Sequence, residues 1–321
     1  MKADALPLVV SIDMSAAIVT VADEQPRVLI IHHKSSEDAL PFGPFDPKGH
    51  RTLESGMRTW VNEQTSLDLG YAEQLYTFGD RGRHTVKSGE GPRVVSVGYL
   101  ALARPSAKLQ APDAMWGDWY RYFPWEDWRE KKPEIIDKTI APALKAFIKF
   151  TDSEKRRERA RLCFGLDGVP WDEDRVLERY ELLYEAGLVE EARRDGRAQA
   201  GQLPATPLGV GMMFDHRRIL ATAIARLRGK MKYRPVVFEL MPQTFTLFEL
   251  QRVVEAISGV RLHKQNFRRL IEAQGLVEGT GKFSAPSRGR PAELFRFRRE
   301  VLGERPAAGV RLGARRLLRE T

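Results

Sequence analysis

The side chains best suited to chemistry gather between positions 262 and 274, in the first turns of an expected helix. One side of this helix would be buried through Phe267, Leu270 and Ile271. Its other side would present six polar or basic residues: His263, Lys264, Gln265, Asn266, Arg268 and Arg269. Amide side chains can bond adenine, and cationic side chains can bond guanine, at base edges in the major groove. DNA recognition helices are built in this way.

A second expected helix lies immediately before it, from Thr246 to Gly259. Thr246 stands three residues before Glu249, which is the capping-box spacing at a helix start, and Gly259 is typical of a helix end. Only three to four residues then remain for the turn between the two helices. Together with an earlier helix expected between Asp215 and Gly229, this order predicts a helix-turn-helix.

The segment after the recognition helix predicts a β-hairpin. Residues 275–281 and 292–298 are expected as its strands, and residues 282–291 as the loop between them. Basic side chains of this loop suit contact with phosphates or a minor groove: Lys282, Arg288 and Arg290. A winged helix that served only as a structural adaptor would not need cations on both projecting elements, so DNA binding is the favoured interpretation.

The distribution of charge is consistent with a polyanionic partner. Residues 211–321 carry 23 basic and 10 acidic side chains, whereas residues 1–150 carry 19 and 20, and residues 151–210 carry 10 and 13. Cations that neutralise DNA phosphates release condensed counterions, which favours binding. The net charge of +9 therefore originates in the last third of the chain. A solvated basic surface would give the same count.

Composition indicates a globular chain of two or three domains. Its 321 residues are 42% hydrophobic and 30% charged, and its apolar runs are too short to span a bilayer. The N-terminus lacks a signal-peptide pattern, so we expect a cytoplasmic protein with no membrane contact. The single cysteine, Cys163, excludes an intramolecular disulfide and a thiolate metal cage.

The N-terminal part has the pattern of an α/β domain. Short runs rich in Val, Ile and Ala predict strands at 8–21, 27–32 and 94–103. Helical spacing of apolar residues predicts an amphipathic helix at 52–65, after a loop rich in Pro and Gly. Strands that alternate with helical segments are typical of a sheet covered by helices.

Domain boundaries follow from these patterns. Residues 116–128 contain four Trp, two Tyr and one Phe, which is typical of a core or a domain seam rather than a ligand cage, and a helix at 134–150 is expected to end the first domain. We expect four parts: an α/β domain at 1–150, a helical linker region at 151–211, the winged helix-turn-helix at 212–302, and a basic C-terminal tail at 303–321.

These segments resemble the NrtR group of Nudix-related transcriptional regulators over about residues 8–150 and 212–300. Residues 40–67 are laid out like a Nudix box, and the sequence YTFGDRGR at 76–83 resembles the loop that follows the box. Matching segments of the C-terminal module are RLRGK at 226–230, YRP at 233–235, FEL at 238–240, NFRR at 266–269, GRPA at 289–292 and FRFR at 295–298. The resemblance implies an α/β (α+β) fold: an N-terminal Nudix-like α/β/α sandwich, a helical region and a C-terminal winged helix-turn-helix.

The Nudix box lacks most of its acids. An active box follows G-x5-E-x7-R-E-U-x-E-E-x-G-U, in which clustered carboxylates hold a divalent metal on a diphosphate. The three clustered positions hold Thr59, Asn62 and Glu63 if the box is anchored on Arg58, or Trp60, Glu63 and Gln64 if it is anchored on Thr65-Ser66-Leu67. The sequence leaves the register open. Only Glu63 survives in either one, so we expect no metal site, no catalytic residue and no hydrolysis.

The resemblance implies that ADP-ribose or a related nucleotide is sensed as an effector, with no required cofactor, and that genes of NAD metabolism are controlled. Independently, Arg81 and Arg83 stand in a Gly-flanked loop and could fork onto a diphosphate. Lys48, Arg58 and Glu63 complete the expected ligand-binding set.

The favoured function is a transcriptional regulator of the repressor type. We expect a homodimer that places two winged helices on a palindromic double-stranded DNA operator, with the nucleotide effector resetting their spacing. The rival hypothesis is an active Nudix hydrolase of nucleotide diphosphates with an accessory winged-helix module, and the lost acids argue against it. The basic recognition helix and wing argue against a purely structural adaptor.

Overall fold

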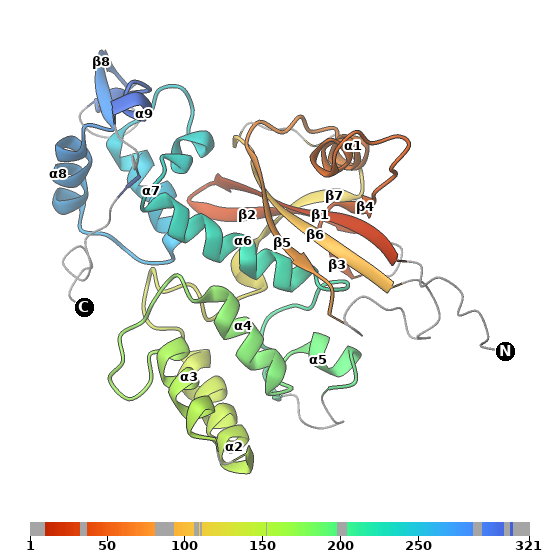
Figure 1. Ribbon diagram of the computed structural model, residues 1–321. Helices are drawn as coiled ribbons and strands as arrows, with labels where there is room; N and C mark the ends of the chain where they lie inside the picture. Colours follow the sequence, from red (N-terminus) through yellow and green to blue (C-terminus); the bar gives the residue numbers. More distant parts are fainter. Residues whose placement is uncertain are drawn as a thin grey trace.

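The computed structural model describes residues 10–32, 37–80, 93–105, 109, 111–151, 153–197, 204–284, 291–304 and 309–310. Figure 1 shows an N-terminal sheet with helices on both faces, a helical region that extends away from it, and a C-terminal unit of helices and a hairpin. Within the described residues, no helix has the length and apolar character needed to cross a membrane.

Seven strands of the described chain form a mixed sheet. They are β1 (Val10–Ala22), β2 (Gln25–His32), β3 (Asp38–Ala39), β4 (Phe42–Pro44), β5 (Ala72–Phe78), β6 (Arg93–Leu102) and β7 (Ala114–Asp118). Their order is β3-β2-β1-β6-β5, with β4 paired to β1 and β7 to β2, and β1 runs parallel to β6. The three strands expected from apolar runs are confirmed. The other four are short or largely exposed, so they leave no such run in the sequence.

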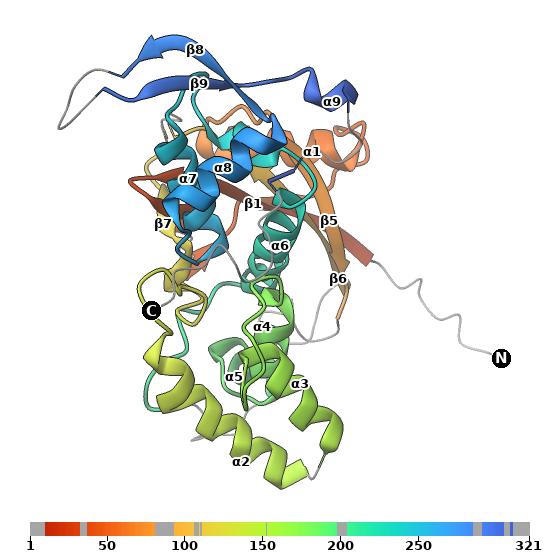
Figure 2. The ribbon, with the colours of Figure 1, turned by 90° about the vertical axis from the view of Figure 1, so that its left-hand side faces the viewer.

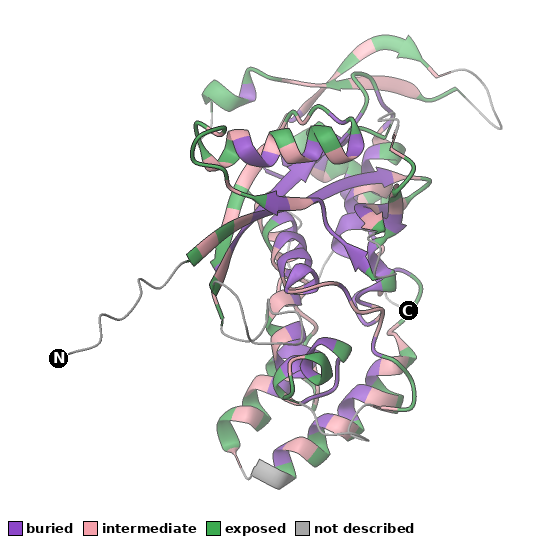
Figure 3. Cartoon of the chain, turned by 90° about the vertical axis from the view of Figure 1, so that its right-hand side faces the viewer, coloured by how far each residue is buried: buried purple, intermediate pink, exposed green. Residues whose placement is uncertain are grey.

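Alternating side chains of β1 separate two layers of the core. Met14 and Ile18 lie in one apolar cluster with α1 (Leu53–Thr65), whereas Ala17 and Val19 lie in the other. A strand buried on both faces shows this two-residue period. Figure 3 shows the buried residues concentrated in the strands and in the helices packed on them.

Helix α6 (His216–Met231) covers the second face of the sheet. It contacts β1, β5 and β6 as well as α4. The sheet therefore lies between α1 and α6 (Figure 1), and the expected α/β/α sandwich is confirmed. The helix expected at 134–150 is present as two elements, a π-helical turn, η2 (Ile136–Ile140), and α2 (Ala141–Thr151). Helix α2 packs on α3. The sheet and α1 thus come from residues before the boundary expected at residue 211, and α6 comes from residues after it. The domain boundaries remain a proposal.

Three further helices, α3 (Glu154–Phe164), α4 (Val176–Glu185) and α5 (Glu190–Arg194), give residues 151–211 the helical character expected for them, where they are described. Helix α3 packs on α2 and α4, and α4 packs on α6. Figure 2 shows α2 and α3 at the opposite end of the molecule from the C-terminal hairpin.

The C-terminal unit contains η3 (Val236–Leu240), α7 (Leu247–Ser258), α8 (Lys264–Gln274), β8 (Val277–Phe283), β9 (Glu293–Phe297) and α9 (Val301–Glu304). The capping box of Thr246 and Glu249 is present with both of its reciprocal hydrogen bonds. Gly259 and Gly275 end α7 and α8 in the left-handed conformation, as expected. The predicted winged helix-turn-helix is therefore confirmed. Its first helix is α6, which ends at Met231 rather than at Gly229 as expected.

Candidate nucleic-acid interface and the Nudix-like site

Helix α8 has the two faces that the sequence predicts. Phe267 and Ile271 are buried and fix the helix on the core of the C-terminal unit. The proposed base-reading and phosphate-binding residues lie on its outer side: His263, Lys264, Gln265, Arg268 and Arg269 are exposed, and Asn266 is half-buried. The first turns of α8 therefore present polar and cationic groups together, as a recognition helix must.

A buried carboxylate holds the turn between α7 and α8. Glu255 Oε1 accepts hydrogen bonds from Leu262 N at 2.9 Å and Gln251 Nε2 at 2.8 Å, while Oε2 accepts from Arg252 Nη1 at 2.8 Å and Arg261 Nη1 at 2.9 Å. Burial alone would raise the pKa of Glu255, but the hydrogen bonds from Leu262, Gln251 and the two arginines outweigh it and lower the pKa. Glu255 thus fixes where α8 begins relative to α7.

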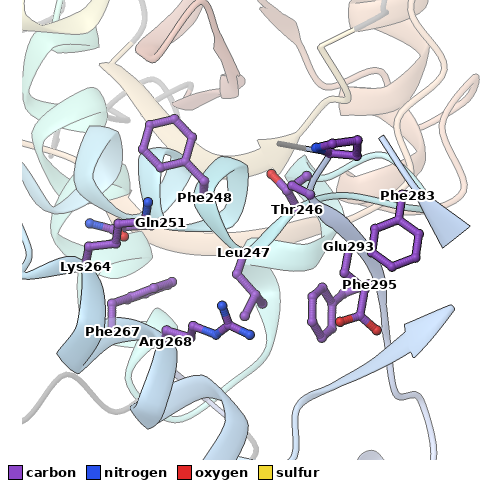
Figure 4. Close-up of a pocket in the computed structure, with 12 residues that line it drawn as sticks. Thr246, Leu247, Phe248, Gln251, Lys264, Phe267, Arg268, Phe283, Glu293 and Phe295 are labelled. Atoms are coloured by element: carbon purple, nitrogen blue, oxygen red, sulfur yellow. The ribbon is translucent and has the colours of Figure 1, made fainter. Parts of the chain in front are cut away.

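A groove of about 400 Å³ lies where α7, α8 and the hairpin meet. Figure 4 shows Lys264 and Arg268 on the α8 side, and Phe283 on the hairpin side. Phe248 is 43% exposed and Phe283 62% exposed, and Lys264 Nζ lies 5.8 Å from the centre of the Phe248 ring. Sequence reasoning missed both aromatics, although Phe248 lies within the capping box of Thr246 and Glu249, and Phe283 directly follows Lys282.

The wing is only partly described. Lys282 is exposed at the end of β8, and Thr280 Oγ1 accepts a hydrogen bond from its backbone N–H at 3.2 Å. The expected wing residues Arg288 and Arg290, and the expected ligand residues Arg81 and Arg83, lie outside the described residues.

The structure decides the register of the Nudix box. Ser66 caps α1 in the left-handed conformation, with φ of 59° and ψ of 24°, where the general pattern has a glycine. Leu67 and Val61, which then take the two apolar positions of the pattern, are buried. The box is therefore anchored on Thr65-Ser66-Leu67, and its three clustered acid positions hold Trp60, Glu63 and Gln64.

At two of these three positions, the side chains make hydrogen bonds from α1 to β4. Trp60 Nε1 donates to the carbonyl of Pro44 at 2.9 Å. Gln64 Oε1 accepts from Phe42 N at 3.1 Å, and its Nε2 donates to Phe42 O at 2.7 Å. The Trp60 ring packs so closely on Gly43 that a Cβ there would lie 2.3 Å from it. Two positions that carry metal-binding acids in an active box thus hold side chains that make hydrogen bonds and packing contacts within the fold.

The remaining expected ligand residues are dispersed around α1. Arg58 donates to Glu54 Oε1 at 3.0 Å, to the Leu69 carbonyl and to Gly70 O at 3.1 Å, so it ties α1 to the loop after it. Glu63 and Lys48 are exposed. Among the described residues, no group of three or more His, Cys, Asp or Glu side chains is arranged to hold a metal ion.

Comparison with known proteins agrees with this architecture. Residues 237–297 match the family model of the NrtR DNA-binding winged helix domain. A stretch of 90 residues is 42% identical to the ADPR responsive transcriptional repressor NtrR of Acinetobacter baylyi; the stretch is 28% of this chain and 36% of that protein.

Solved structures show the same fold over nearly the whole chain. NrtR of Shewanella oneidensis, solved in complex with a 27mer DNA, matches with a TM-score of 0.54 at 21% identity, covering 91% of this chain and 95% of that one. A MutT/nudix family protein of Enterococcus faecalis matches with a TM-score of 0.52 at 16% identity, covering 93% and 90%. The fold is that of a Nudix-like domain joined to a winged helix. The resemblance to the NrtR group seen in the sequence is confirmed.

Proposed function

We propose that this chain is a transcriptional repressor that binds double-stranded operator DNA through its winged helix and senses ADP-ribose or a related nucleotide through its Nudix-like domain. The observation that carries the proposal is the outer face of α8, where polar and cationic residues are held in place by the buried Glu255. The relative from Acinetobacter baylyi is named as an ADP-ribose-responsive repressor, which supports both halves of the proposal.

We infer that the Nudix-like domain binds nucleotide without hydrolysing it and needs no cofactor. Trp60 and Gln64 occupy acid positions of the box and are engaged with β4, which leaves Glu63 as the one acid of the cluster. Hard divalent cations prefer several anionic oxygens, so a single carboxylate is a poor site for them. Arg81 and Arg83 remain the leading proposed effector contacts, with Lys48, Arg58 and Glu63 as further ones.

The proposal includes a cytoplasmic homodimer that controls genes of NAD metabolism. Two winged helices related by a twofold axis would match a palindromic operator. For the nucleotide to regulate binding, its affinity for the DNA-competent and incompetent arrangements must differ, because equal affinity shifts no population.

The test combines DNA and nucleotide in one experiment. Genomic fragments are captured by the purified protein with and without added ADP-ribose. The affinity of the protein for each enriched fragment is then measured by fluorescence anisotropy, again with and without ADP-ribose. We expect a palindromic fragment whose affinity changes at least several-fold with ADP-ribose, and no turnover of ADP-ribose with magnesium or manganese. Turnover that Glu63→Gln abolishes would support the hydrolase hypothesis instead.

A further inference from the structure

The sequence marks the aromatic segment 116–128 as core or a domain seam, and residues 119–129, here called the seam, join the regions of the molecule. Its aromatic side chains Trp119, Tyr122, Phe123 and Trp125 are fully buried. The segment follows β7 and contacts the sheet, α6 and α7. The proposed function uses none of these residues, yet they form the structural connection between the Nudix-like sheet and the helix-turn-helix.

A buried ion cluster lies at the centre of this seam. Glu126 accepts hydrogen bonds from Arg179 of α4, at 2.5 Å from Nε to Oε1 and 3.0 Å from Nη2 to Oε2. Its Oε2 also accepts from Arg228 Nη1 of α6 at 2.6 Å. All three side chains are at most 1% exposed. One carboxylate is therefore shared by two buried guanidinium groups, and its removal would leave both without their ion-pair partner among the described residues.

From this cluster, contacts lead directly to the end of α7. Arg228 Nε donates to the carbonyl of Ile257 at 2.8 Å, and Tyr120 Oη donates to the carbonyl of Ala256 at 2.8 Å. Carbonyls at a helix C-terminus are partially negative, so a cation is favourable there. The backbone N–H of Trp128 donates to Gly259 O at 2.7 Å. At Gly259 a Cβ would lie 2.4 Å from Glu126 O, so the turn can approach the seam this closely only without a side chain.

The same contacts continue to Arg261, in the turn before α8. Arg261 Nη2 donates to Glu130, just beyond the seam, at 2.9 Å, while its Nη1 donates to Glu255. Glu255 in turn accepts from the backbone N–H of Leu262. The seam and the adjoining Glu130 therefore contact both ends of the turn that sets the direction of the recognition helix.

We propose that Glu126 is the positioning residue through which the nucleotide-sensing domain sets the orientation of the recognition helix. This inference rests on the proposed function. Glu126 bonds Arg179 of α4 and Arg228 of α6, and Arg228 also donates to Ile257 O at the end of α7, so a change in the sheet that moves α6 also moves α7. Coupling between two sites requires an element whose arrangement both sites bias, and the Glu126 cluster supplies the contact between the two.

The test measures coupling separately from folding and from ligand binding. Two variants weaken the cluster: Glu126→Gln removes its negative charge, and Arg228→Lys keeps the positive charge but cannot reach Glu126 and Ile257 O together. Arg226→Lys is the matched control, because Arg226 lies on the same helix, is 44% exposed and pairs with Glu73 at 3.8 Å. Circular dichroism checks folding, calorimetry measures ADP-ribose binding, and anisotropy measures operator affinity with and without ADP-ribose.

In the absence of DNA, we expect Arg228→Lys and Glu126→Gln to bind ADP-ribose within about twofold of the parent, because neither residue is among the proposed effector contacts. Allosteric coupling typically changes affinity by roughly 5- to 150-fold, so its loss is measurable. The ADP-ribose-induced change in operator affinity should fall to less than about twofold, while Arg226→Lys keeps the parent's response. If Glu126→Gln does not fold, Arg228→Lys alone decides the question. A folded Arg228→Lys protein with the parent's full response would overturn the inference. Failure of the parent itself to bind DNA would refute the proposed function, and the inference with it, before any variant is compared.

Discussion

Single side chains on α8 and the hairpin should differ in what they read on DNA. Under the proposed function, we expect Arg269, in the first turns of α8, to reach base edges and Lys282, at the end of β8, to contact phosphates. Loss of a good base contact costs about 1–3 kcal/mol and is specific to the operator. Loss of a phosphate contact weakens binding to every sequence and lowers the salt slope by about one.

We therefore predict that Arg269→Ala weakens operator binding but barely changes binding to a scrambled duplex, and that Lys282→Ala weakens both. Fluorescence anisotropy at several salt concentrations measures the difference. Lys149→Ala is the control for loss of charge, because Lys149 is exposed on α2 at the other end of the molecule. If Arg269→Ala and Lys282→Ala both matched Lys149→Ala, α8 and the hairpin would not be the DNA-reading surface.

The contact between Trp60 and Gly43 gives a second prediction at the residue scale. A Cβ at position 43 would lie 2.3 Å from the indole, so Gly43→Ala should destabilise the protein by about 1–3 kcal/mol, as overpacking does. Trp60→Ala makes room for the new methyl group. In the double variant the two costs should be clearly less than additive, because the residues are in contact. Additive free energies of unfolding, measured with denaturant, would show that Trp60 does not pack on β4.

At the scale of elements, Glu255 makes the geometry of α7 and α8 depend on pH. Its lowered pKa means that the folded protein binds the proton less readily than the unfolded chain. The stabilisation is therefore complete above the ordinary glutamate pKa of about 4.3 and is lost as the pH falls through the lower pKa of the folded state.

Glu255→Gln should lower the free energy of unfolding at pH 7 by about 3 kcal/mol, because Arg252 and Arg261 lose their shared buried acceptor. The difference between parent and variant should shrink as the pH falls from about 4.3, where the unfolded chain takes up the proton, through the lower pKa of Glu255 in the folded protein. Denaturant unfolding between pH 3 and pH 7 measures this. A difference that stays constant over that range would show that Glu255 is not ionised in the folded protein.

At the scale of the whole molecule, the apolar core runs without interruption from the sheet into the helix-turn-helix. Val19 of β1, Tyr180 of α4, Leu220 of α6 and Leu250 of α7 belong to one buried cluster. Elements that share a core stabilise one another, so we predict a single cooperative unfolding transition for the chain. Helix content by circular dichroism and tryptophan fluorescence should change at the same temperature.

ADP-ribose should raise that common transition temperature, because a ligand that binds only the folded state stabilises all elements that unfold with its site. Calorimetry of the full chain with and without ADP-ribose is the measurement. A separate transition of the C-terminal unit, unmoved by ADP-ribose, would contradict a shared core and would also weaken the argument for coupling through Glu126.

The sequence by itself determined the features that depend on neighbouring residues. Short-range spacing predicts the capping box at Thr246, the helix ends at Gly259 and Gly275, and the polar side of α8. The reason is that the residues within one turn decide where a helix starts and stops. The apolar runs of β1, β2 and β6 likewise predict these strands, since a strand buried on both faces is apolar along most of its length.

Only the tertiary structure decided what depends on residues distant in the chain. The register of the Nudix box needed the conformation of Ser66, and the role of Trp60 needed its contact with Gly43. The Glu126 cluster joins positions 126, 179 and 228, which no local pattern relates. The second layer of the sandwich comes from α6 rather than from the helix after residue 134. An amphipathic pattern shows that a helix has a buried face, but the path of the chain decides which surface covers it.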